Sequence, residues 1–276
     1  MKELLISAID AGIQAGNAIL AVYETDFQVE HKSDHSPLTL ADQKSHRILV
    51  DQLADHRLPV LSEEGRHLPF EERKRWPSFW LLDPLDGTKE FVKRNGEFTV
   101  NIALIEKQAP VLGVIYVPVG DMLYFGTTAE GAYKLERAQA AWKEIQNGPA
   151  DIDGRLQRLV QRSLKLPHAA STPAVFTIVG SRSHSTPEVD DIKREMQRRH
   201  GEVALVSAGS SLKLCMVAEG RAHLYPRTGP TMEWDTAAGQ AIAQAAGARV
   251  VEFGTDQPLL YNKENLRNPW FEVKTT

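Results

Sequence analysis

Leu81-Leu82-Asp83-Pro84-Leu85-Asp86-Gly87-Thr88 is the most informative segment of this 276-residue chain. It begins as an apolar strand and ends abruptly in carboxylates. Pro84 fixes one backbone angle and removes a hydrogen-bond donor, and Gly87 permits a backbone conformation that other residues disfavour. Asp83 and Asp86 can then face one point, with the carbonyl of the leucine between them. This all-oxygen arrangement suits Mg²⁺ or Ca²⁺.

The same segment has competing interpretations. A D-x-x-D-G sequence is often only an acidic surface turn. A calcium-binding EF-hand loop that begins at Asp83 would need Glu at its twelfth position, where Arg94 stands. A dehalogenase-type phosphatase would need Asp two residues before Asp86, where Pro84 stands.

Residues 88–91 can start a helical turn whose N–H groups attract an anion, and phosphate-ester chemistry needs a cation site beside an anion site.

Composition excludes several classes of protein. The chain has 32 Lys and Arg against 36 Asp and Glu, a net charge of −4, whereas a protein that coats nucleic acids is normally basic. The sequence has no run of about 18 apolar residues, so we expect no membrane span. Cys215 is the only cysteine, which excludes an intrachain disulfide. It lies in an apolar run, which indicates a small core residue rather than a nucleophile.

Hydrophobic periodicity predicts two helices and then several strands in the first half of the chain. Apolar and small residues recur every three or four positions over 2–23. A second helix over 39–54 begins with Thr39 and Asp42, spaced as a capping box. The predicted strands are 59–62, 79–82, 100–105, 111–116, 124–125 and 132–135. This order favours helices packed on a largely antiparallel sheet.

A polar segment over 136–174, interrupted by prolines, separates this half from the next. We interpret it as a boundary or insertion between an N-terminal half (1–140), a connecting segment (141–174) and a C-terminal half (175–276). The C-terminal half alternates strands and helices, as an α/β unit does. Its predicted strands are 176–179, 203–206, 222–225 and, as the final strand, 249–253; its predicted helices are 187–200, 210–219 and 234–246.

Further acids stand where predicted strands end or helices begin. Glu63 and Glu64 follow an apolar strand, and Asp235 opens an alanine-rich helix. Each has an ordinary explanation, because paired acids form solvated turns and Asp42 and Asp235 suit helix N-termini. If these acids converge with Asp83, like-charge repulsion raises their pKa values. Bound divalent cations would remove that cost and keep the carboxylates ionised.

Three segments in this order are similar to the signature of a known superfamily. They are Glu63-Glu64, Asp83-Pro84-Leu85-Asp86-Gly87-Thr88 and Trp234-Asp235-Thr236-Ala237-Ala238. The superfamily contains the lithium-sensitive, Mg²⁺-dependent phosphatases of the inositol monophosphatase type. Segments 60–64, 83–101, 181–184, 209–213 and 224–227 most resemble its bacterial 3′(2′),5′-bisphosphate nucleotidases. The resemblance covers nearly the whole chain and implies an α+β fold, a five-layered αβαβα sandwich.

The resemblance also implies chemical roles at matching positions. Two or three Mg²⁺ ions would be held by Glu63, Asp83, the carbonyl of Leu85, Asp86 and Asp235. Asp42 and Thr88 would polarise the attacking water, and Glu64 would act nearby. Hydrolysis would then proceed in line, without a covalent enzyme intermediate.

The implied substrate is a small nucleotide, adenosine 3′,5′-bisphosphate, hydrolysed to AMP and phosphate; 3′-phosphoadenylyl sulfate is a second candidate. Basic residues would hold the distal phosphate. The candidate contacts are Gly87, Thr88, Ser181, His184, Ser210, Lys213 and Arg227. Each of the three basic residues could equally be a solvated surface charge.

Two other functions stay open at this point. An inositol or sugar phosphate phosphatase would share the metal centre, and a non-catalytic metal or nucleotide sensor would share the fold. We expect no nucleic-acid polymer as partner. The resemblance implies a cytoplasmic protein, with peripheral association at the inner membrane and the oligomeric state left open.

Overall fold

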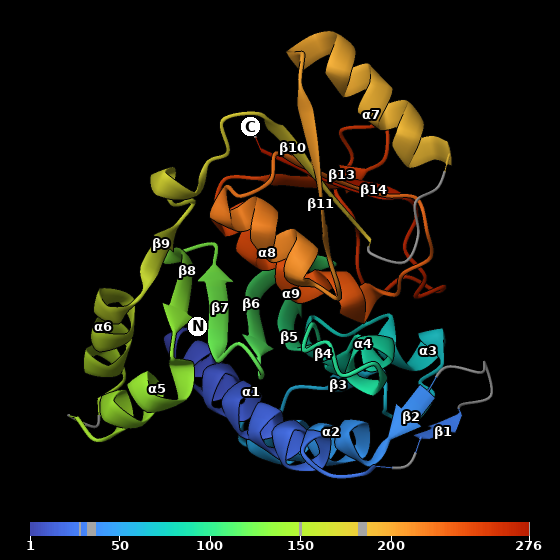
Figure 1. Ribbon diagram of the computed structural model, residues 1–276. Helices are drawn as coiled ribbons and strands as arrows, with labels where there is room; N and C mark the ends of the chain where they lie inside the picture. The colour runs from blue at the N-terminus through green and yellow to red at the C-terminus, as the bar shows by residue number, and fades with distance from the viewer. Residues whose placement is uncertain (28, 32–36, 149–150, 182–186, 276) are drawn as a thin grey trace.

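Helices and sheets alternate in five layers (Figure 1). The computed structural model describes residues 1–27, 29–31, 37–148, 151–181 and 187–275. Helices α1 (Lys2–Tyr23) and α2 (Leu40–Leu53) cover the outer face of a seven-stranded sheet, and α7 (Pro187–His200) covers the outer face of a five-stranded sheet. Helices α8 (Leu212–Glu219) and α9 (Glu233–Ala245) lie between the two sheets. The predicted αβαβα sandwich is confirmed.

The first sheet has the strand order β3-β4-β5-β6-β7-β8-β9. Its strands are β3 (Val60–Ser62), β4 (Ser78–Asp86), β5 (Thr99–Glu106), β6 (Ala109–Val117), β7 (Met122–Thr127), β8 (Gly131–Glu136) and β9 (Leu164–Leu166). Only β3 and β4 pair in parallel, so the prediction of a largely antiparallel sheet is confirmed. Every strand except β9 was expected from the sequence.

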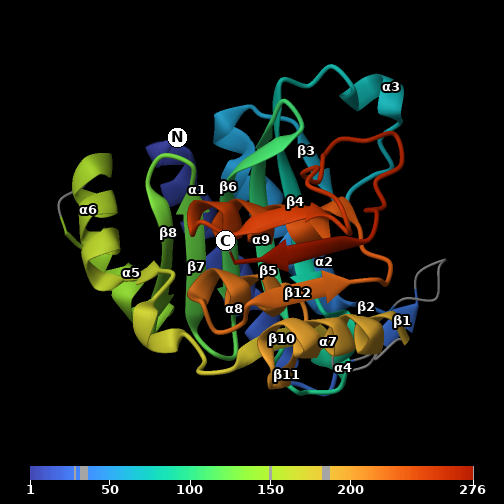
Figure 2. The ribbon, with the colours of Figure 1, turned by 90° about the horizontal axis from the view of Figure 1, so that it is seen from above.

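The segment over 136–174 contains more regular structure than its composition indicated. It forms α5 (Ala138–Gln146), α6 (Ile152–Arg162), β9 and the short 3₁₀ helix η2 (Ala169–Ser171). The indole of Trp142 is buried and donates a hydrogen bond to Asp10 of α1 at 2.8 Å. The two helices therefore extend the outer helical layer beside α1, on the opposite side of the molecule from β1 and β2 (Figure 2). The domain boundaries proposed around this segment remain a prediction.

The second sheet has the order β11-β10-β12-β14-β13. Its strands are β10 (Phe176–Ser181), β11 (Val203–Ala208), β12 (Leu224–Arg227), β13 (Arg249–Glu252) and β14 (Phe271–Lys274). The expectation that 249–253 is the final strand is wrong. Strand β14 lies between β12 and β13 and pairs antiparallel with both. It has only four residues and follows a long irregular segment, so local periodicity gave no sign of it.

The remaining elements are short. They are β1 (Val29–His31), β2 (Pro37–Thr39), α3 (Phe70–Arg73), α4 (Thr88–Val92) and the 3₁₀ helix η1 (Ala54–His56). The helical turn expected at 88–91 is therefore present as α4. Cys215 is buried, as predicted.

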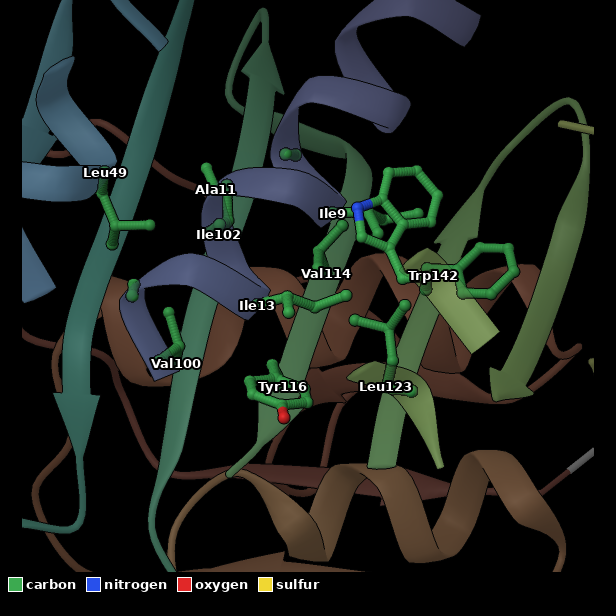
Figure 3. Close-up of a cluster of buried hydrophobic side chains, with 14 of the residues drawn as sticks. Ile9, Ala11, Ile13, Leu49, Val100, Ile102, Val114, Tyr116, Leu123 and Trp142 are labelled. Atoms are coloured by element: carbon green, nitrogen blue, oxygen red, sulfur yellow. The ribbon is translucent and has the colours of Figure 1, made fainter. Parts of the chain in front are cut away.

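Helix α1 packs across the middle of the first sheet. Ile13 belongs to one cluster with Ile102 and Val114 (Figure 3). A Cβ atom on Gly16 would lie 2.3 Å from the ring of Tyr116, so glycine is required for α1 to approach β6 this closely. α1 has the length and apolarity of a membrane-spanning helix, but 61% of its most apolar window is buried inside the fold, as in a core helix.

The inner helical layer sets the position of α9 against the first sheet. A Cβ atom on Gly113 of β6 would lie 2.2 Å from the carbonyl oxygen of Ala238 in α9. Backbone therefore packs against backbone here, which only glycine allows. Helix α9, which begins at Glu233, therefore packs directly on β6, and it also contacts β4.

Candidate active site

The end of β4 turns two aspartates toward the same point. Side chains three residues apart in a regular strand face opposite sides of a sheet. The pairing of β4 with β5 shifts register between Asp83 and Asp86, and such a bulge re-aims the side chains that follow it. The Leu85 N–H donates to Asp83 Oδ1 at 3.1 Å, and Gly87 adopts a φ of 91°, the conformation predicted for it.

Helix α9 brings a third aspartate to this point from the C-terminal half. Asp235 lies in its first turn, where Oδ2 accepts a hydrogen bond from the Met232 N–H at 2.9 Å. One carboxylate oxygen from each of Asp83, Asp86 and Asp235 lies within 4.8 Å of the others. The capping role of Asp235 and its place in this cluster are therefore compatible, because hydrogen bonding to the backbone uses one oxygen only.

The cluster carries an electrostatic cost in the protein alone. Burial raises the pKa of Asp83 well above its usual value, and the nearby charges of Glu63, Asp86 and Asp235 raise it further. Burial also raises the pKa of Asp235, with Asp86 adding to the effect. The buried carboxylates of Glu219 and Glu233, by contrast, form ion pairs with lysines.

No lysine or arginine forms an ion pair with the three clustered aspartates within the part of the chain that the structure describes. The donors are all oxygens, which hard divalent cations prefer. A cation at this point would supply the missing positive charge, so the residues present fit Mg²⁺.

A second pair of residues adjoins the cluster. Asp42 Oδ2 accepts hydrogen bonds from the Thr39 N–H at 2.8 Å and the Thr39 hydroxyl at 2.7 Å, which confirms the predicted capping box. The Thr88 hydroxyl lies 3.4 Å from Asp42 Oδ1 and 3.3 Å from the Leu85 carbonyl oxygen. The Ser45 hydroxyl donates to the carbonyl of the neighbouring Pro84 at 2.6 Å, which fastens α2 to this turn.

The adjacent glutamates Glu63 and Glu64 follow β3 and are half-buried. The charge of Glu63 acts on Asp83, which places it beside the aspartate cluster. The charge of Glu64 acts instead on His46 of α2, whose pKa is lowered by burial with Glu64 opposing the shift. Glu63 therefore acts on the aspartate cluster and Glu64 on α2, and the separate roles expected for the two acids remain predictions.

A cavity of about 340 Å³ opens beside the cluster and reaches into the C-terminal half. Lys213 is 6% exposed, and its ammonium donates to the carbonyls of Ser210 at 2.6 Å and Ala208 at 3.3 Å. Burial lowers its pKa to about 8, although Asp86 opposes the shift. Predicted site residues on the cavity wall are Asp86, Gly87, Ser210, Lys213, Arg227 and Asp235.

Two predicted contacts stay predictions. Ser181 ends β10, but its side chain lies outside the described part of the structure, as does the whole of His184. Ser210 lines the cavity, but its hydroxyl donates to Asp86 Oδ2 at 2.6 Å, so a direct contact with substrate stays a prediction.

Sequence reasoning also missed several residues of the site. Lys89, Lys93 and Tyr225 line the cavity, and Asn101 donates to Asp86 Oδ2 at 3.3 Å. Asn101 was detectable as a single polar residue inside an otherwise apolar strand, since buried polar groups are normally hydrogen-bonded.

Comparisons with known proteins agree with this geometry. The model of the inositol monophosphatase family matches residues 1–270. The chain belongs to the inositol monophosphatase family. The 3′(2′),5′-bisphosphate nucleotidase CysQ of Escherichia coli strain K12 is 44% identical over 264 residues, covering 94% of each chain.

Solved structures extend the comparison. CysQ from Bacteroides thetaiotaomicron, described as a bacterial member of the family, superimposes with a TM-score of 0.89 at 47% identity and covers 100% of this chain and 98% of that one. The extragenic suppressor protein suhB of Bartonella henselae gives a TM-score of 0.71 at 21% identity, covering 99% of this chain and 94% of that one, and so shares the fold.

Proposed function

We propose that the protein is a Mg²⁺-dependent phosphomonoesterase that hydrolyses the 3′-phosphate of adenosine 3′,5′-bisphosphate to AMP and phosphate. The sulfated nucleotide 3′-phosphoadenylyl sulfate is a second substrate of the same site. The observation that carries the proposal is the meeting of Asp83, Asp86 and Asp235, from two halves of the chain, beside a cavity that contains a buried lysine. The named activity of relatives at 44% identity supports the choice of substrate.

In this proposal the carboxylates hold the metal centre. Asp83, Asp86, Asp235 and Glu63, with the Leu85 carbonyl oxygen, supply the oxygen ligands, and Glu64 acts nearby. Bound Mg²⁺ would lower the pKa of a water molecule and stabilise the negative charge that develops on the phosphoryl group.

Thr88 and Asp42 would orient the attacking water. The Thr88 hydroxyl donates toward Asp42 Oδ1, so its own oxygen lone pairs can accept a hydrogen bond from the water. Asp42 is fixed by its two bonds to Thr39 and holds the hydroxyl in this direction. The water oxygen forms a bond to phosphorus as the bond to the 3′-oxygen breaks, and the departing oxygen takes up a proton.

The second phosphate of the substrate would bind deeper in the cavity. Lys213 is held by two backbone carbonyls and is not neutralised by a carboxylate ion pair among the described residues. Arg227 stands on the same wall, and its buried Nε has no hydrogen-bond partner there. Two cations in one cavity favour a doubly phosphorylated nucleotide over an ester with a single phosphate. Inhibition by Li⁺, a role in sulfur metabolism and a cytoplasmic location complete the proposal.

A substrate panel tests the proposal. Phosphate release from adenosine 3′,5′-bisphosphate, 3′-AMP and inositol 1-phosphate would be compared in Mg²⁺ and in EDTA. We expect Mg²⁺-dependent hydrolysis with the highest kcat/KM for the bisphosphate. A preference of about tenfold or more for the inositol ester would replace the proposed substrate with an inositol phosphate. No Mg²⁺-stimulated release from any ester would indicate a non-catalytic sensor.

A further inference from the structure

Behind Asp86 lies a chain of buried polar groups that the proposed mechanism does not use. Thr99, Asn101 and Ser211 are polar, yet each is at most 1% exposed, because they lie between the first sheet and the inner helices. Thr99 and Asn101 belong to β5, whereas Ser210 and Ser211 precede α8. The chain thus connects the two halves of the molecule at the metal site.

Within the described residues, the hydrogen bonds to the Asp86 side chain all reach the same oxygen. Oδ2 accepts from the Ser210 hydroxyl at 2.6 Å, the Ser211 N–H at 2.6 Å and the Asn101 amide at 3.3 Å. Three donors on one oxygen fix the rotation of the carboxylate group. The other oxygen, Oδ1, has no hydrogen bond within the described ranges and is the one left for a cation.

The donor and acceptor roles in this chain are determined by Asp86. An ionised carboxylate only accepts, so the single proton of the Ser210 hydroxyl is committed to Asp86. The Ser210 oxygen must therefore accept from Thr99, whose hydroxyl oxygen lies 2.7 Å away. On the other branch, Asn101 donates its amide proton to Asp86. The Ser211 hydroxyl lies 2.9 Å from both Asn101 Oδ1 and the Thr99 hydroxyl oxygen, so its single proton can go to either acceptor.

Thr99 is the group that both branches share. Because its single proton goes to Ser210, its oxygen accepts from the Ser211 hydroxyl, 2.9 Å away, and Ser211 in turn lies 2.9 Å from Asn101 Oδ1. Chains of hydrogen bonds that end on a charge polarise one another. Removal of the Thr99 hydroxyl would therefore loosen Asp86, although no hydrogen bond joins the two side chains in the described structure.

The same loop also forms a wall of the cavity. Ser210 has a φ of 51°, and its carbonyl accepts from the buried Lys213 at 2.6 Å while its hydroxyl holds Asp86. The Gly209 N–H donates to Glu97 at 2.8 Å, which anchors the loop from its other end. One short segment thus contacts a predicted phosphate ligand on one side and a predicted metal ligand on the other.

We propose that Thr99 is a positioning residue that orients Asp86 through Ser210 and, by way of Ser211, through Asn101, and that this chain couples filling of the cavity to Mg²⁺ binding. The inference rests on the proposed metal role of Asp86. By linkage, a nucleotide that strengthens Mg²⁺ binding must itself bind more tightly in Mg²⁺, by the same factor. Loss of the Thr99 hydroxyl reduces that factor.

Isosteric variants test the inference. Thr99→Val removes the hydroxyl and keeps the shape, and Thr99→Ser keeps the hydroxyl. Thr127→Val is the matched control, because Thr127 is equally buried on β7 and its hydroxyl accepts only from the Glu130 N–H in the described chain. Mg²⁺ binding is measured by titration calorimetry on the whole protein, first without nucleotide and then with AMP.

We expect Thr99→Val to weaken Mg²⁺ binding on the order of tenfold, because the hydrogen bonds that orient the charged Asp86 carboxylate are weakened. We also expect AMP to change the Mg²⁺ affinity of this variant less than that of the wild type. Thr99→Ser and Thr127→Val should bind Mg²⁺ like the wild type. Wild-type Mg²⁺ affinity in Thr99→Val, or an equal loss in Thr127→Val, would overturn the inference.

Two further results keep the test decisive. If Thr99→Val does not fold, Ser211→Ala serves in its place, because it removes one hydroxyl from the chain but keeps the N–H that Asp86 accepts; unchanged Mg²⁺ affinity there also overturns the inference. Failure of the wild type to bind Mg²⁺ would instead contradict the proposed function.

Discussion

Replacing Asp235 with Asn separates the metal-binding role of the cluster from its role in stability. The substitution keeps an oxygen that can accept the Met232 N–H but removes one negative charge from three carboxylates within 4.8 Å of one another. At that distance one like-charge pair costs roughly 3 kcal/mol at an effective dielectric constant of about 20. Asp235 is partly exposed, so after screening we expect the metal-free protein to gain about 1–3 kcal/mol.

Thermal unfolding measures this gain. At about 2–4 °C per kcal/mol for a chain of this size, the Tm of Asp235→Asn in EDTA should lie several degrees above that of the wild type. Mg²⁺ should then stabilise the wild type much more than the variant, and the rate of phosphate release should fall on the order of 10³-fold. The control is Asp256→Asn, which makes the same chemical change in an exposed ion pair with Arg249.

The pH dependence of stability has a definite sign. The folded protein binds protons at Asp83 and Asp235 more tightly than the unfolded chain, because both pKa values are raised from 3.8. In EDTA the free energy of unfolding therefore falls as the pH rises from the usual aspartate pKa through the raised pKa values of Asp83 and Asp235. Mg²⁺ should flatten this dependence. A variant Asp235→Asn that is less stable than wild type in EDTA, or that retains more than about a tenth of its rate in saturating Mg²⁺, would refute the reasoning.

The remaining predictions concern other parts of the site and the fold. Thr88→Val should lower kcat on the order of 10²-fold without weakening Mg²⁺ binding, and Thr88→Ser should restore much of it; steady-state kinetics and calorimetry check both. Lys213→Met should raise the KM for the bisphosphate. Since burial lowers the pKa of Lys213 to about 8, the wild-type KM should rise above about pH 8, and the variant should lack that rise. Gly113→Ala should lower the free energy of unfolding by about 1–3 kcal/mol in denaturant titrations, because its Cβ would meet the carbonyl of Ala238. A denaturation midpoint of Gly113→Ala equal to that of the wild type would contradict this expectation and would mean that α9 can move away from β6.

Helices and strands with strong periodicity were predictable from the sequence. The helix over 2–23 and the capping box of Thr39 and Asp42 depend on local spacing, and the structure has both. Strand β14 was not predictable, because its four residues gain their stability from pairing on both sides with β12 and β13. Strand β9 likewise depends on its single partner β8.

The candidate site shows the same contrast between residues identifiable from local sequence and features that depend on long-range contacts. The acids after β3 and within β4, together with Asp235, were identifiable from residue type and order. The bulge that turns Asp83 and Asp86 to one side arises from pairing with β5, which a single segment does not reveal. The use of the Ser210 hydroxyl on Asp86, and the support from Asn101, depend on contacts between the two halves.

Anomalous diffraction from crystals grown with Mn²⁺ and AMP tests the central claim most directly. Mn²⁺ takes the same oxygen ligands as Mg²⁺ and gives a strong anomalous signal. The account predicts peaks within bonding distance of the carboxylates of Asp83, Asp86 and Asp235, next to a nucleotide in the cavity. Peaks elsewhere in the molecule, with these three carboxylates bonded to no metal, would contradict it.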